Sequence, residues 1–165
     1  MKILALLAAA VLVAGLSPAA ALDKPTGPVV LTVKGAIANT NSDAGAEFDL
    51  AMLTALPGRV TEVETPWTSG KPRFEGPLAR AVLEAVGATG TMLKVTALND
   101  YSADVPVEDL EKHDVILATT MDGKPMSVRD KGPLFIIYPF DAEPDLFTEV
   151  YFNRSVWQIA TIEVR

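Results

Sequence analysis

The amino-acid sequence predicts a mixed α+β domain, and two observations carry this prediction. Segments with strand-like alternation or β-rich composition outnumber the segments with helical periodicity. The expected helices are not regularly interleaved with the strands, as they would be in a doubly wound parallel sheet. The sequence also shows no internal repeat and no low-complexity tract. We therefore expect one domain over residues 29–165, preceded by a flexible polar lead-in over residues 22–28.

Strands are predicted where β-branched and aromatic residues alternate with polar ones or form short apolar runs. They cover residues 29–34, 59–65, 92–98, 103–105, 115–120, 134–138 and 155–164. The last strand contains Trp157, which is expected in the core. The run at 134–138 is the most apolar internal segment, and a basic loop leads into it from the Asp122-Gly123 turn. Two interpretations of that loop stay open, a ligand rim and a long connection.

Helices are predicted where apolar residues recur at helical spacing. They cover residues 48–56, 78–86 and 107–111. Asp49 is expected near the N-terminus of the first helix. The second helix is the strongest, since Pro77 suits its first turn and Gly87 ends it. The segments 66–77 and 141–146 are expected to be irregular.

Residues 1–21 have the features of a secretory signal peptide, with Lys2 as the positive n-region and residues 3–16 as the apolar region. Ser17-Pro18 breaks the apolar run, and the small residues that follow put the expected cleavage after Ala21. The apolar run is shorter than the roughly 20 residues of a membrane span, so an uncleaved anchor is the disfavoured alternative. We therefore expect export to the periplasm.

The composition excludes several classes of function. The net charge is −7 at pH 7, which makes the chain a poor candidate for binding nucleic acid or anionic lipid. The absence of cysteine excludes disulfides, thiolate metal ligands and thiol nucleophiles. The single histidine, His113, stands at an expected exposed helix end and supports neither a histidine-rich metal site nor a Ser-His-Asp triad. Because Pro144 interrupts the acids Asp141, Glu143 and Asp145, we expect a solvated loop there rather than a calcium site.

Several blocks of the sequence, taken in order, resemble the molybdopterin-dependent oxidoreductase family with the sulfite-oxidase fold. These blocks are FEGPL at 74–78, VTALNDYSADVP at 95–106, the segment 116–139 and SVWQIATIEV at 155–164. The resemblance covers most of the expected mature chain and is strongest to the small exported stand-alone members. It implies a compact α+β domain with a twisted mixed sheet. In the enzymes of the family, this domain holds a molybdenum atom bound by a molybdopterin dithiolene.

In those enzymes one protein thiolate, upstream of the Phe-x-Gly segment, completes the coordination of the molybdenum. The matching region of this sequence is 63–68, VETPWT, and it has no cysteine. Soft ligands suit such a metal, so Thr, Glu or Trp would not replace the thiolate. The resemblance therefore implies the fold and a cleft of the molybdopterin type, whereas the missing thiolate argues against molybdenum ligation in this chain.

Seven residues are candidates for binding a ligand at this cleft. They are Trp67, Asn99, Asp100, Tyr101, Arg129, Lys131 and Arg154. The three cations suit phosphate, sulfate or carboxylate, and the resemblance adds that the family's cofactor carries a terminal phosphate. Alternatively, they only balance the neighbouring acids Asp122, Asp130 and Glu149. The bend at 99–101 and Trp67 also allow structural interpretations, as a capped turn and as a core plug.

Three functional interpretations follow from the resemblance and the missing thiolate. The leading one is a non-catalytic or cofactor-free binding module that uses the cleft for a small anionic ligand or a protein partner. The alternative is an oxidoreductase that still binds a molybdopterin, with oxygen ligands or solvent in place of the thiolate. The third is a structural accessory of a membrane-bound sensor or redox complex.

Overall fold

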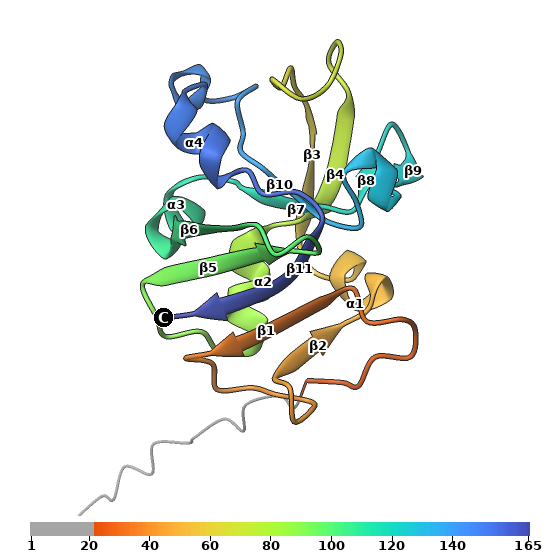
Figure 1. Cartoon of the computed structure of the whole chain (residues 1–165), viewed down its shortest axis with the longest axis vertical. Coiled ribbons are helices and arrows are strands. Elements are labelled where there is room, and N and C mark those ends of the chain that lie inside the picture. Colours follow the sequence, from red (N-terminus) through yellow and green to blue (C-terminus); the bar gives the residue numbers. More distant parts are fainter. Residues whose placement is uncertain (1–21) are drawn as a thin grey trace, which may run out of the picture.

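The computed structural model describes residues 22–165 and places their strands in a five-stranded, a four-stranded and a two-stranded sheet. Figure 1 shows the five-stranded sheet in the lower half of the molecule and the shorter strands above it. The signal peptide predicted for residues 1–21 lies outside the described residues. Between residues 22 and 165, no helix has the length and hydropathy needed to cross a bilayer.

The five-stranded sheet brings both ends of the described chain together. Its strands, in spatial order, are β2 (Ala46–Phe48), β1 (Leu31–Gly35), β11 (Ile159–Val164), β5 (Met92–Ala97) and β6 (Ser102–Pro106). β11 runs parallel to β1 and antiparallel to β5, so the C-terminal strand lies in the middle of a mixed sheet (Figure 1). Burial alternates strictly along β5, because successive side chains point to opposite faces and one face packs on the core.

The shorter strands form hairpins. They are β3 (Gly58–Glu62), β4 (Arg73–Pro77), β8 (Thr120–Met121) and β9 (Lys124–Pro125), together with the pair β7 (Ile116–Ala118) and β10 (Phe135–Ile137). The prediction of an irregular segment over 66–77 is wrong for its last five residues, which form β4. Pairing with β3 and β8 stabilises β4 from both sides. Gly76 lets it approach β7, because a Cβ there would lie 2.1 Å from the carbonyl oxygen of Leu117.

Short α-helices connect the strands. They are α1 (Leu50–Thr54), α2 (Ala79–Val86), α3 (Val107–Lys112) and α4 (Glu149–Arg154). Asp49 caps α1 as predicted by accepting the N–H of Met52 at 2.9 Å, although Phe48 belongs to β2 rather than to the helix. The other carboxylate oxygen of Asp49 accepts the N–H groups of Thr26 and Gly27, both at 2.8 Å. The lead-in, for which we expect flexibility, is therefore attached to the domain at this cap.

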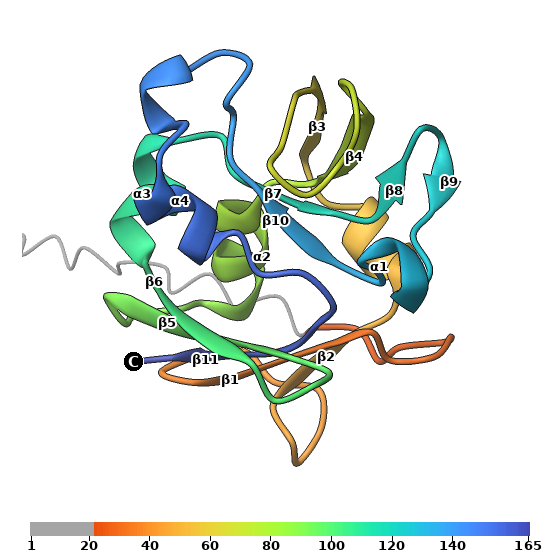
Figure 2. The ribbon, with the colours of Figure 1, turned by 45° about the horizontal axis from the view of Figure 1, so that its top comes forward.

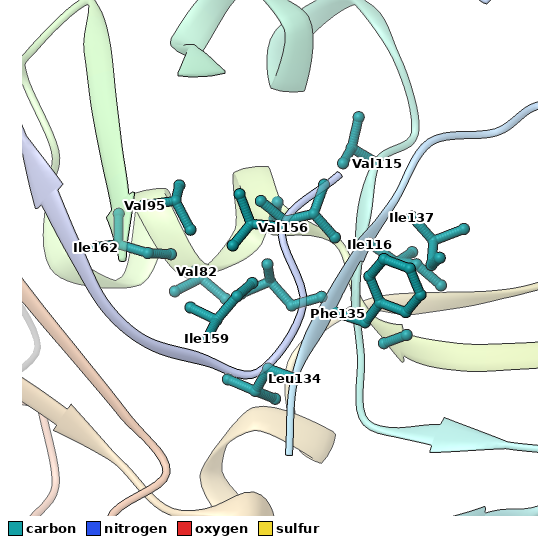
Figure 3. Packing of buried hydrophobic residues seen from close by; sticks show 14 of the residues in the cluster. Val82, Val95, Val115, Ile116, Leu134, Phe135, Ile137, Val156, Ile159 and Ile162 are labelled. Carbon is teal, nitrogen blue, oxygen red and sulfur yellow. The ribbon is translucent and has the colours of Figure 1, made fainter. Parts of the chain in front are cut away.

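The buried run predicted at 134–138 lies at the centre of the core, and β10 forms its middle. Its five residues are at most 2% exposed. Figure 3 shows side chains of this run packed among apolar residues of α2, β7 and β11. The N–H of Ile136 donates to the carbonyl of Val156 at 2.9 Å, so the run also holds the segment before β11. That segment, 155–158, is predicted as strand but lies outside it, and β11 starts only at its end.

Candidate functional site

Two adjoining cavities share the side chain of Trp67. The first, which we name the aromatic cleft, has a volume of about 310 Å³ and is lined by Trp67, Ala97, Asn99, Tyr101, Phe152, Asn153, Ser155 and Trp157. The second, the basic shelf, has a volume of about 280 Å³ and is lined by Trp67, Thr68, Ser69, Pro72, Met121, Asp122, Arg129, Asp130 and Lys131. Five of the seven predicted residues line one of these cavities, namely Trp67, Asn99, Tyr101, Arg129 and Lys131.

The walls of the aromatic cleft are rings that pack at steep angles to one another. The ring centre of Trp67 lies 5.5 Å from that of Trp157 and 5.7 Å from those of Phe135 and Phe152. These distances are typical of favourable aromatic pairs. Trp67 is half-buried and packs against the core, so it is both a core plug and a cavity wall. The prediction that Trp157 belongs to the core is only partly right, because this side chain is half-buried and lines the cleft.

The polar edge of the aromatic cleft carries amide and hydroxyl groups but no charge. The Oδ1 atom of Asn99 accepts the N–H of Tyr101 at 3.2 Å, which is the capped turn that the sequence allows. Asp100 has φ +65° at the tip of this turn and lies outside the residues that line the two cavities. Asn153 and Ser155 also line the cleft. Neither was predicted, because their role depends on α4, which the sequence does not reveal.

The cations Arg129 and Lys131 line the basic shelf, and the Nζ atom of Lys131 lies 5.2 Å from the ring centre of Trp157. Within residues 22–165 neither cation has an ion-pair partner. Two of the acids expected to balance them, Asp122 and Asp130, line the same shelf but form no ion pair with them. Asp122 accepts the N–H of Arg73 at 2.9 Å, and Asp130 accepts a side-chain hydroxyl at 2.7 Å. The shelf thus combines two cations without an ion-pair partner among the described residues and two carboxylates that accept other hydrogen bonds.

Arg154 does not join Arg129 and Lys131 at one edge, contrary to the prediction. Its Nη1 atom donates to Oδ2 of Asp109 at 2.7 Å, and the hydroxyl of Tyr138 donates to the same oxygen at 2.7 Å. We name these three residues (Asp109, Tyr138 and Arg154) the α4 latch, because they hold α4 beside α3 (Figure 2). Burial, followed by the bond to Asp109, raises the pKa of the Tyr138 hydroxyl far above its ordinary value, so it stays a donor.

His113 and the acidic loop at 141–146 form contacts with other side chains. The Nδ1 atom of His113 lies 2.6 Å from Oε2 of Glu143, and its side chain is 17% exposed. The expectation of an exposed helix end is therefore right for the neighbouring Lys112 and Asp114 but not for His113 itself. Asp141 accepts two hydrogen bonds from Arg59, at 2.9 and 3.2 Å. In the described part of the chain, no three His, Asp or Glu side chains are placed to hold a metal ion.

The donor atoms beside Trp67 do not suit molybdenum. In the segment 63–68, the hydroxyl of buried Thr65 lies 2.7 Å from that of Thr68. Hydroxyl oxygens are hard donors and do not reproduce the soft anionic thiolate that the resemblance implies for this position. No cysteine stands anywhere in the sequence to replace it. The residues present therefore do not fit the metal of the family.

Comparison with known proteins agrees with the fold. No curated protein matches this chain. The structure is similar to the crystal structure of the sulfane dehydrogenase SoxCD from Paracoccus pantotrophus, with a TM-score of 0.58 and 15% sequence identity over 81% of this chain. The match covers 37% of that chain, so this domain spans little more than a third of the enzyme's length.

A family model also matches most of the sequence. Its description is "Oxidoreductase molybdopterin binding domain", and it matches residues 50–164. This finding confirms the resemblance drawn from the sequence, and the structure confirms the α+β fold with a mixed sheet and few short helices. The chain belongs to the family of oxidoreductase molybdopterin-binding domains.

Proposed function

We propose that this domain is a non-catalytic, cofactor-free binding module whose aromatic cleft takes a small planar ligand with an anionic group. The observation that carries the proposal is the placement of unpaired Lys131 over the ring of Trp157, in a chain without a thiolate for the family's metal. The proposal extends to the location of the protein, since the signal peptide predicted for residues 1–21 would export it to the periplasm.

We propose a planar ligand because of the walls of the cleft. Trp67, Trp157 and Phe152 offer apolar ring surfaces around a cavity of about 310 Å³, which is the size of a small ligand site. Aromatic rings favour flat partners that stack or meet them edge to face. Asn99 and Asn153 place amide groups at the edge, where they fix the orientation of a ligand with polar substituents.

We propose an anionic group on the ligand because of the cations in the basic shelf. Lys131 and Arg129 lie next to the aromatic cleft, and a guanidinium group binds carboxylate, sulfate or phosphate by two parallel hydrogen bonds. A ligand whose ring enters the cleft beside Trp157 would bring its substituents close to the ammonium group of Lys131. Arg129 and Lys131 share the shelf with the carboxylates of Asp122 and Asp130, so the proposed preference for an anion rests on the position of Lys131 beside Trp157 and not on the net charge of the shelf.

The proposal that no molybdenum cofactor is bound is supported by the donor set. The alternative function, a molybdopterin-dependent oxidoreductase with oxygen ligands, would need Thr65 and Thr68 or solvent to hold the metal. Those two hydroxyls bond to each other and are neutral. Elemental analysis and mass spectrometry of the protein purified after export discriminate the two functions. Stoichiometric molybdenum and pterin would contradict our proposal, and a co-purified membrane protein would favour an accessory role.

Calorimetric titration of the exported protein with naphthalene-2-sulfonate tests the binding function, with neutral 2-naphthol for comparison. We expect the sulfonate to bind more tightly. A contact between charges at a solvated edge contributes about 1 kcal/mol, so Lys131→Met should lower the affinity for the sulfonate about fivefold. Affinity for 2-naphthol should not change. Lys34→Met removes an exposed charge from β1 and should leave both affinities unchanged. Equal binding of the two probes would contradict the proposal.

A further inference from the structure

Gln158 joins three segments around the aromatic cleft. Its backbone N–H donates to the carbonyl of Lys131 at 3.0 Å, and its Nε2 atom donates to the carbonyl of Val128 at 2.7 Å. Its own carbonyl accepts the N–H of Leu98 at 2.9 Å. The residue therefore ties the loop that carries Arg129 and Lys131 to the turn between β5 and β6.

Gln158 and Lys131 both adopt the left-handed backbone conformation, with φ of +55° and +69°. This conformation is uncommon for long side chains and costs about 1 kcal/mol or more at each residue. Among residues 22–165, the other non-glycine residues with positive φ are Asp100 and Asp122. Asp122 lines the basic shelf, and Asp100 lies between two residues of the aromatic cleft. The strained residues thus gather at the site, as they do where surrounding contacts fix a functional geometry.

Trp157 and Lys131 form a cation–π pair, and Gln158 is connected to each of them in a different way. It follows Trp157 in the chain, and its backbone N–H holds the carbonyl of Lys131. Its side chain holds the same loop three residues earlier, at Val128. These two hydrogen bonds go to backbone carbonyls, so they restrict the backbone position of the loop from which the Lys131 side chain extends to Trp157.

We infer that Gln158 is the positioning residue that holds Lys131 over Trp157 and thereby sets the preference of the cleft for anions. The statement about ligands rests on the proposed function, whereas the statement about the Lys131–Trp157 pair stands by itself. If Gln158 had only a stabilising role, it would hold the two loops together without fixing the position of the Lys131 ammonium group. The test must therefore measure the charge beside Trp157 and not only the stability of the fold.

Quenching of tryptophan fluorescence measures that charge. The chain has two tryptophans, so in a Trp67→Phe background all indole emission comes from Trp157. A neighbouring ammonium group attracts iodide and repels caesium, so the ratio of iodide to caesium quenching at fixed ionic strength reports on Lys131. Lys131→Met in the same background gives the ratio without the charge. We expect a clearly higher ratio in the parent protein.

Two substitutions of Gln158 separate the hydrogen bond from the backbone strain. Gln158→Met keeps the length of the side chain and removes its donor, whereas Gln158→Gly also relieves the positive φ. We expect both variants to lose the iodide preference and to reach the ratio of Lys131→Met. A lowered melting temperature with an unchanged quenching ratio in both variants would show that Gln158 only stabilises the fold, and it would overturn the inference.

Two further measurements keep the test decisive. If Trp67→Phe does not fold, ¹⁹F NMR of 5-fluorotryptophan in the otherwise native chain replaces it. The Trp157 resonance should then shift in the same direction for Lys131→Met and Gln158→Met, and opposite or absent shifts would overturn the inference. In calorimetry, Gln158→Met should lose about fivefold in affinity for naphthalene-2-sulfonate, as Lys131→Met does. Should the parent protein bind neither probe, the proposed function fails, but the quenching ratio still decides the role of Gln158.

Discussion

Replacing Asp109 by asparagine should destabilise the domain by about 2 kcal/mol. The substitution keeps the shape of the side chain but removes its charge. Oδ2 accepts one hydrogen bond from Tyr138 and one from Arg154, both at 2.7 Å. A hydrogen bond to a charged group contributes about 1.5–3 kcal/mol and a neutral one about 0.5–1.5 kcal/mol, so each bond loses about 1 kcal/mol. Asp109 is 8% exposed, so water does not replace its charge, whereas the side chain of Arg154 is 26% exposed and regains some hydration.

Urea unfolding followed by circular dichroism measures this loss, which corresponds to a melting temperature lower by roughly 4–8 °C for a domain of this size. Asp114→Asn is the matched control, since Asp114 binds Arg80 at 2.6 Å but its side chain is 55% exposed. An exposed pair of this kind contributes less than about 0.5 kcal/mol. Equal losses in the two variants, or no loss in Asp109→Asn, would refute the reasoning that burial makes the α4 latch strong.

Two further predictions concern the frame of the fold and its pH dependence. Gly76→Ala should lower the free energy of unfolding in urea by about 2 kcal/mol or more, since its Cβ would lie 2.1 Å from the carbonyl oxygen of Leu117. Gly123→Ala is the control: its Cβ meets no atom within 4 Å, so the free energy of unfolding should fall by only about 1 kcal/mol, from the positive φ alone. Hydrogen bonds from the backbone of Met52 and Gly27 hold the pKa of Asp49 below its ordinary 3.8. The ionised carboxylate of Asp49 therefore stabilises the fold fully above pH 3.8, and this contribution disappears as the pH falls through the lower pKa of the folded state. The stability difference between the parent protein and Asp49→Asn should therefore be constant from about pH 7 to 5 and narrow below about pH 4, and a constant difference down to about pH 2 would contradict this assignment.

Much of the fold could be predicted because its longer elements carry strong local signals. The helix α2 shows regular apolar spacing and ends at Gly87 with φ +61°, as the sequence indicates. The run at 134–138 is apolar throughout and is buried in the core. In contrast, α4 was missed because its six residues are too few for a periodic pattern. β4 was missed because one of the two strands that pair with it, β8, comes from a distant part of the chain.

The candidate site could be predicted less well, since side-chain direction depends on tertiary structure. Arg154 is predicted from the sequence as a cleft residue, whereas its neighbours Phe152 and Asn153 are the ones that line the cleft. Arg154 turns away toward α3 because the carboxylate of Asp109 lies there. No local pattern pairs these two residues, which are 45 positions apart. The three hydrogen bonds of Gln158 are equally invisible in the sequence, because they require two loops to meet.

Trp67 contributes to the walls of both cavities through its packing. It belongs to the segment that the resemblance aligns with the thiolate of the enzymes, and here its indole ring packs against Phe135 in the core while it lines both cavities. Each such ring pair contributes about 0.5–1.5 kcal/mol beyond burial, so packing provides stability that a bound cofactor provides in other proteins. A ligand therefore meets a preformed cleft. It should stabilise the domain only by the linkage term RT ln(1 + [L]/Kd), whereas a domain that needs molybdopterin to complete its fold would gain cooperative structure on binding.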